Sequence, residues 1–265
     1  MDEPHVLLTN DDGIDSVGFR ALYDAISEFA EVTAVAPNGD KSAVGRAMSR
    51  EVAVETHDLG YAIHGTPADC TVVGLEALCP EVDMVVAGCN RGANLGAYVL
   101  GRSGTVSAAV EAAFFDVPAI AVSLYVPGDD GEWQHAADQP RDYRNASEAT
   151  AYLVEHALGA GVFEQAEYLN VNAPIWSEGD DLAPLEITEP STLYDMRAER
   201  QGERISLIDN VWARMRDDDL PDPPGTDRRA IVEGRVSVSP LTAPHSTQHH
   251  EALDALAETY RDRSE

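Results

Sequence analysis

Two adjacent carboxylates, Asp11 and Asp12, follow a short apolar run at residues 6–8. Like charges repel each other, and no Lys or Arg stands beside them in the sequence, so either water or a cation must offset this charge. Carboxylate oxygens are ligands that Mg²⁺ and Mn²⁺ prefer, and the hydroxyl of Ser42 and the amide of Asn90 could complete an oxygen shell. The alternative is a turn in which an aspartate caps the next helix.

A second candidate lies at Ser103-Gly104-Thr105, which opens an Ala-rich segment without a charge until Glu111. The first turn of a helix presents free N–H groups and partial positive charge, which suits a phosphate. Gly104 would let the backbone approach such a group closely. The alternative is an ordinary helix cap.

A third candidate is the Gly- and Asn-rich stretch GCNRGANLG at residues 88–96. These residue types permit positive φ angles and close backbone approach, and Arg91 could steer an anion or pair with an acid. The alternative is a mobile loop. The dinucleotide pattern GxGxxG after the first strand, the P-loop pattern, the EF-hand pattern and zinc-like His/Cys spacing are all absent from the sequence.

The elements that must position these residues alternate between strands and helices. Apolar runs predict strands, and residues with helical spacing predict helices between them. Continuous apolar strands are typical of a parallel sheet covered on both faces, so we predict an α/β, Rossmann-like, doubly wound and mostly parallel sheet. Ligands of such sheets collect at the carboxyl ends of the strands, where all three candidates fall. The predicted strands are 5–9, 31–37, 82–88, 118–125 and 168–175, and the predicted helices are 17–29, 66–78, 103–115 and 146–158.

The chain changes character after residue 178. We expect an α/β core over residues 1–178, a polar extended arm or hairpin over 179–234, and a C-terminal strand and helix over 235–265. The last helix is predicted at 246–260 with Ser246 as its cap. The acidic stretch at 126–144 is left without a predicted role.

The composition is strongly acidic, with 47 Asp and Glu against 18 Lys and Arg, a net charge of −29. This charge argues against binding to a nucleic-acid duplex. It would also destabilise a compact state in ordinary salt, whereas at molar salt the screening length falls to about 3 Å. We therefore expect a protein of a salt-rich cytosol, as in a halophile. The alternative is an acidic mesophilic protein.

No apolar run approaches the roughly 20 residues that span a bilayer, and the N-terminus lacks a basic region followed by an apolar stretch. The three cysteines, Cys70, Cys79 and Cys89, form no CxxC pair, so a disulfide framework is not expected. These observations predict a soluble, cytoplasmic protein without a membrane partner.

Taken together, these segments resemble the SurE family, the survival-protein nucleotidases. The match is collinear over most of residues 6–125 and weaker to residue 242. The resembling stretches are LLTNDDGIDSVGFRAL, VAPNGDKSAVGRA, HGTPADC, VVAGCNRGANLG, SGTVSAAVEAA, PAIAVSL, PPGTD and GRVSVSPL. Two departures are Ser42-Ala43, where the family usually carries Ser-Gly, and Cys89, where Ile is usual.

The resemblance implies a divalent-metal-dependent phosphatase of nucleoside monophosphates, with 3′-nucleotides and short polyphosphate as further substrates of some members. It implies one Mg²⁺ or Mn²⁺ per subunit, and a homodimer or homotetramer built through an exchanged C-terminal arm. The matching metal ligands are Asp11, Asp12, Ser42 and Asn90, and the matching phosphate-pocket residues are Asn94, Ser103, Gly104 and Thr105.

Two mechanisms remain open at this point: in-line attack by metal-activated water, and attack by Asp11 through an aspartyl phosphate. A different class also remains open, namely a non-catalytic nucleotide-binding regulatory protein on the same fold. Such a protein would keep the phosphate pocket and need no metal.

Overall fold

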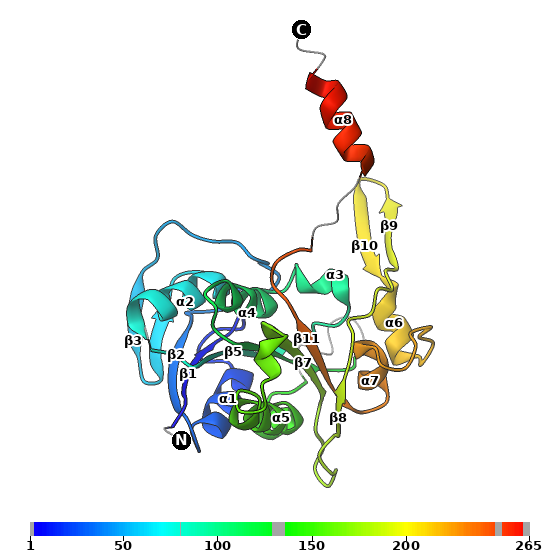
Figure 1. The fold of residues 1–265 in the computed structure, drawn as a ribbon. Coiled ribbons are helices and arrows are strands. Elements are labelled where there is room, and N and C mark those ends of the chain that lie inside the picture. Colours follow the sequence, from blue (N-terminus) through cyan, green and yellow to red (C-terminus); the bar gives the residue numbers. More distant parts are fainter. Residues whose placement is uncertain (1–2, 80, 129–135, 247–250, 262–265) are drawn as a thin grey trace.

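One mixed sheet of nine strands forms the centre of the computed structural model, which describes residues 3–79, 81–128, 136–246 and 251–261 (Figure 1). In the order in which they lie side by side, the strands are β3 (Val54–His57), β4 (Gly60–Ile63), β2 (Glu31–Pro37), β1 (His5–Thr9), β5 (Met84–Arg91), β6 (Ala119–Tyr125), β7 (Tyr168–Pro174), β11 (Val236–Leu241) and β8 (Leu185–Ile187). The six strands from β4 to β7 in this order are parallel to one another, whereas β3 is antiparallel to β4 and β11 is antiparallel to β7. This arrangement confirms the predicted α/β fold class.

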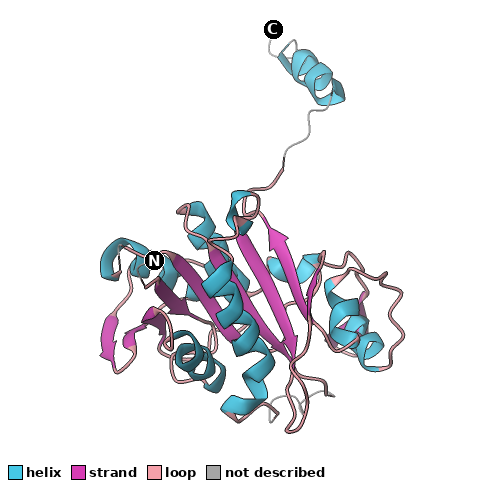
Figure 2. Ribbon diagram, turned by 60° about the horizontal axis from the view of Figure 1, so that its bottom comes forward, coloured by secondary structure: helices cyan, strands magenta, loops and turns pink. Residues whose placement is uncertain are grey.

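Helices cover both faces of the sheet (Figure 2). On one face α1 (Val17–Ile26) packs beside α5 (Arg144–His156), and on the other α2 (Pro67–Val73) packs beside α4 (Gly104–Phe114). Successive side chains of a strand point to opposite faces, so Val6 and Leu8 join the core under α1 and α5, whereas Leu7 joins the core under α2 and α4. Because β1 contributes side chains to both cores, its residues 6–8 are apolar without interruption.

Local signals define several element ends. Thr66 and Asp69 form a capping box at the start of α2, with hydrogen bonds from the Asp69 N–H to Thr66 Oγ1 (3.2 Å) and from the Thr66 N–H to Asp69 Oδ2 (2.8 Å). The helix expected over 66–78 changes to a π-helical turn at Gly74–Leu78. Shorter helical segments are α3 (Ala97–Leu100), η3 (Pro140–Tyr143) and η4 (Val162–Glu164).

The polar region after β7 contains the predicted hairpin. Strands β9 (Met196–Gln201) and β10 (Arg204–Asp209) pair antiparallel and extend from the body, and α6 (Asn210–Arg216) and α7 (Asp227–Val232) follow (Figure 1). A small apolar cluster of its own holds this region together, made by Leu95, Val211, Met215, Leu220 and Ile231. The region is therefore packed at its base and extended at its tip.

The C-terminal helix α8 (Glu251–Arg261) stands away from the rest of the structure (Figures 1 and 2). Its expected start at Ser246 adjoins residues 247–250, which lie outside the described residues, as do residues 129–135 of the unassigned acidic stretch. No helix in the described part of the chain is long and apolar enough to cross a membrane.

Candidate active site

The loops after β1 and β2 are held against each other at the carboxyl edge of the sheet. The Lys41 N–H donates to the backbone oxygen of Asp11 at 2.7 Å. Gly13 has φ +99°, and a Cβ there would lie 3.0 Å from the Cα of Gly39, so both the backbone angle and the close approach require glycine. The loop that carries Ser42 is thereby fixed beside Asp11.

The start of helix α4 lies directly against Asp11. The Thr105 hydroxyl donates to Asp11 Oδ1 at 2.6 Å. A Cβ at Gly104 would lie 2.9 Å from both the Cβ and Oδ2 of Asp11, which leaves no room for a side chain. Ser103 caps the helix by accepting the Val106 N–H at 3.0 Å. The helix end and the carboxylate therefore share one small space.

Asp12 is held by strand β5. The Arg91 N–H donates to Asp12 Oδ2 at 2.8 Å. We predicted that this strand would end at residue 88, but it continues to Arg91, and its register with β6 shifts between Ala87 and Asn90. An irregularity of this kind turns the side chains that follow it, which explains how Asn90 faces the site from a strand rather than from a mobile loop.

Burial raises the pKa of both carboxyl groups. The side chain of Asp11 is almost fully buried, and burial followed by the charge of Asp12 raises its pKa to about 7. Burial also raises the pKa of Asp12, against the hydrogen bond from the Arg91 backbone. Neither aspartate caps the next helix, because Ser16 occupies the cap position of α1. A nearby cation would relieve the cost of ionising both groups.

The donor set suits a hard divalent cation. The described residues contain no group of three or more His, Cys, Asp and Glu side chains placed to hold a metal. A metal bound here would be held by the two carboxylates together with neutral oxygens, the ligand type of Mg²⁺ and Mn²⁺. The Asn90 amide donates its N–H to the Gly92 oxygen, and its Oδ1 accepts no hydrogen bond from the described residues. The Ser42 hydroxyl donates to Asp40 Oδ1 at 2.6 Å.

A cavity of about 830 Å³ opens over this edge of the sheet. Of the eight predicted site residues, Asp12, Gly104 and Thr105 are not among the lining residues, although Thr105 contacts Asp11, which is. The other five line the cavity directly, namely Asp11, Ser42, Asn90, Asn94 and Ser103.

Sequence reasoning missed the residues that fix Asn94. Its backbone N–H donates to Asn172 Oδ1 at 2.8 Å, and its amide donates to the Ser123 hydroxyl at 2.8 Å. Its backbone oxygen accepts the Asn170 amide at 2.9 Å. Asn170 and Asn172 alternate within the apolar strand β7, and such a pattern of polar residues in a buried strand was the available signal.

A second missed anchor comes from α7. Asp227 Oδ2 accepts the Gly96 N–H at 2.6 Å, and the buried guanidinium of Arg228 donates to the Leu95 oxygen at 3.2 Å. The PPGTD stretch, noted above only for its resemblance, thus holds the end of the Asn90–Gly96 segment.

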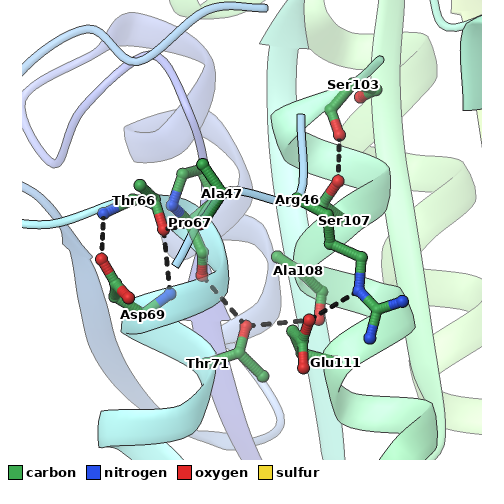
Figure 3. A network of polar contacts seen from close by, with 10 residues as sticks. All are labelled: Arg46, Ala47, Thr66, Pro67, Asp69, Thr71, Ser103, Ser107, Ala108 and Glu111. Carbon is green, nitrogen blue, oxygen red and sulfur yellow. Dashed lines mark hydrogen bonds and ion pairs between the residues drawn. The ribbon is translucent and has the colours of Figure 1, made fainter. Parts of the chain in front are cut away.

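The loop that carries Ser42 has a further anchor on α4 (Figure 3). The Arg46 guanidinium donates through Nε to Glu111 Oε1 at 2.6 Å, and Glu111 is buried in the otherwise uncharged helix. One residue along, the Ala47 oxygen accepts the Thr66 hydroxyl at 2.7 Å. These contacts fix the far side of the loop to α2 and α4.

Comparison with known proteins identifies the family of the chain. Residues 6–199 match the family model described as "Survival protein SurE". The chain belongs to the SurE family. It is 63% identical over 261 residues to "5'-nucleotidase SurE" of Haloarcula marismortui, covering 98% of this chain and 96% of the relative. It is 57% identical over 257 residues to the protein of the same name from Halobacterium salinarum, covering 97% of this chain and 98% of that relative.

A solved SurE structure shares the fold. The crystal structure of the SurE protein from Aquifex aeolicus superposes with a TM-score of 0.76 at 28% identity, covering 92% of this chain and 95% of that one. The SurE assignment made from the sequence motifs is therefore confirmed, and the similarity extends through the C-terminal region where those motifs were weak.

Proposed function

We propose that this SurE protein is a divalent-metal-dependent phosphomonoesterase that converts nucleoside 5′-monophosphates to nucleoside and phosphate. The printed names of its relatives support the reaction. The observation that supports the proposal most is the hydrogen bond from Thr105 to Asp11, because it joins a helix N-terminus, which suits a phosphate, to a carboxylate, which suits a metal.

We assign the roles as follows. Asp11, Asp12, Ser42 and Asn90 hold one Mg²⁺ or Mn²⁺ per subunit. When bound, that cation supplies positive charge to the phosphoryl group and acidifies the attacking water. The phosphate oxygens are held by the N–H groups at the start of α4 and by the residues around them, namely Asn94, Ser103, Gly104 and Thr105.

We propose water as the nucleophile, and an attack by Asp11 is the rival. Asp11 is buried and accepts a hydrogen bond from the Thr105 hydroxyl, which orients the carboxylate and favours a role as a ligand. Acid quenching during turnover, followed by a search for phosphate bound to Asp11, separates the two. We expect no trapped acyl phosphate, and its detection would establish the rival.

The function is tested by AMP hydrolysis in about 3 M KCl with and without Mn²⁺. We expect phosphate release that needs the metal and is lost in Asp12→Asn while AMP still binds. Binding of AMP by the wild type without hydrolysis under any metal would instead identify a regulatory nucleotide-binding protein.

We also propose the division of the chain at residues 178 and 234, and assembly into a homodimer or homotetramer. Exposed apolar side chains on the hairpin and on α8 support the assembly, namely Ile205, Leu207, Leu253, Leu256 and Tyr260. Light scattering on the eluted protein in about 3 M KCl tests it, and a monomer at micromolar concentration would contradict it.

A further inference from the structure

The cavity extends well beyond the carboxylates and the start of α4. Its other lining residues include several in the C-terminal region, from the end of β10 and from α6. That region lies toward the edge of the sheet away from β1 and β2. A phosphate would occupy the end near Asp11 and Ser103, so the remaining space must receive the leaving group. The residues from this region are Leu207, Ile208, Asp209, Asn210, Trp212, Ala213 and Arg216.

Two aromatic side chains, Trp212 on α6 and Tyr125 at the end of β6, line this part of the cavity. Both are half-buried, and both pack against the apolar cluster that contains Leu95 and Val211. One side of each ring system is therefore fixed by the protein while another part faces the cavity.

No hydrogen bond joins the indole N–H of Trp212 or the hydroxyl of Tyr125 to another described residue, and neither atom is among the fully buried ones. Both groups can therefore donate to acceptor atoms of a molecule bound in the cavity. Ligand cavities typically combine aromatic walls with a few such polar groups.

A nucleobase fits this chemistry. It has a flat π face that stacks on aromatic rings and an edge of nitrogen and oxygen acceptors. We propose that Trp212 and Tyr125 form the nucleobase subsite, with Trp212 as the main stacking partner. This inference rests on the proposed nucleotidase function and adds the residues that make the enzyme prefer a nucleotide to a simpler phosphate ester.

The test compares AMP with ribose 5-phosphate, which carries the same phosphate and sugar without the base. Steady-state kinetics are measured in about 3 M KCl with Mn²⁺ for the wild type, Trp212→Leu and Trp212→Phe. Leucine keeps an apolar contact with the cluster but removes the stacking plane, whereas phenylalanine keeps both.

We expect Trp212→Leu to raise the KM for AMP about tenfold or more, with little change in kcat. The kcat/KM for ribose 5-phosphate should change less than about twofold, and Trp212→Phe should recover most of the affinity for AMP. Equal losses for both substrates in Trp212→Leu would overturn the proposal, because they would show a general structural role.

Two further arms keep the result interpretable. The same comparison of AMP with ribose 5-phosphate is made for Tyr125→Leu and Tyr125→Phe, whose position lies on β6. If Trp212→Leu does not fold, these two variants test the subsite in its place. A wild type that hydrolyses AMP and ribose 5-phosphate with equal kcat/KM overturns the subsite alone. A wild type that hydrolyses neither substrate overturns the proposed function.

Discussion

The Thr105 hydroxyl and the Asp11 carboxylate, 94 residues apart in the sequence, meet through a hydrogen bond of 2.6 Å. This contact joins the first turn of α4 to the end of β1. It fixes the orientation of a buried carboxylate and brings a helix N-terminus, which attracts anions, beside a pair of acids, which attracts a cation. In the proposed function, a phosphoryl group binds in the cavity beside both of them.

Replacing Thr105 with Val should weaken metal binding while preserving the size of the side chain. Outer hydrogen bonds to ligands typically change metal affinity by about 10- to 100-fold, so we expect the Kd for Mn²⁺ to rise by about tenfold. Electron paramagnetic resonance of free Mn²⁺ measures this directly. Thr105→Ser retains the hydroxyl and serves as the control; an unchanged Kd in Thr105→Val would show that the hydrogen bond does not orient a ligand.

The buried Asp11 should make the metal-free protein less stable as the pH rises. Its pKa is raised from 3.8 to about 7, so the protonated form favours folding. That contribution is complete below about pH 4 and is lost as the pH rises through 7. The free energy of unfolding, measured by denaturant titration from pH 5 to 8 after chelation, should fall more steeply for the wild type than for Asp11→Asn. Parallel curves would contradict the assignment.

The ion pair between Arg46 and Glu111 should position the loop that carries Ser42. Removal of Glu111 by substitution with Ala should raise the Mn²⁺ concentration needed for half-maximal activity by a few-fold. A double-mutant cycle with Arg46→Ala should give a coupling free energy of about 1 kcal/mol, since the arginine is partly exposed. Arg144→Ala, which breaks an exposed pair on α5, is the matched control. Additive effects at the two sites would argue against the anchor.

The capping box at the start of α2 should contribute to global stability. Asp69 accepts the N–H groups of Thr66 and Ser49, so Asp69→Ala should reduce the free energy of unfolding by about 1–2 kcal/mol. Burial alone would raise the pKa of Asp69, but these hydrogen bonds lower it below 3.8. Its contribution is therefore present above pH 4 and lost as the pH falls further. Asp24→Ala, at an exposed position on α1, should change stability by less than about 0.5 kcal/mol.

The net charge of −29 should make folding dependent on salt. Molar KCl screens the repulsion among the acidic side chains, so the melting temperature should rise steadily between about 0.2 and 3 M KCl. Differential scanning fluorimetry across this range provides the measurement. A melting temperature independent of salt would contradict the predicted adaptation to a salt-rich cytosol.

Local patterns were sufficient to predict much of the α/β core. Apolar runs mark β1 and β2, and Thr66 with Asp69 marks the start of α2, because those features depend on residues close in sequence. The continuation of β5 to Arg91 depends on its register with β6, which no local pattern contains. Helices α6 and α7 form over an apolar cluster that includes Leu95, so they also depend on distant contacts.

The candidate site also contains residues that the sequence identified and residues that it did not. The position of Asp11 and Ser103 at strand ends follows from the topology of a parallel sheet, so they were identifiable from the sequence. The sequence did not predict that Asn170 and Asn172 hold Asn94, or that Trp212 lines the cavity. Both features depend on which distant segments meet in the fold.

The most direct test of the central claim is an anomalous difference map from crystals soaked in Mn²⁺. We predict one strong peak per chain with metal–oxygen distances of about 2.0–2.2 Å to carboxylate oxygens of Asp11 and Asp12. A well-occupied manganese site elsewhere, with no density beside these two aspartates, would contradict the account.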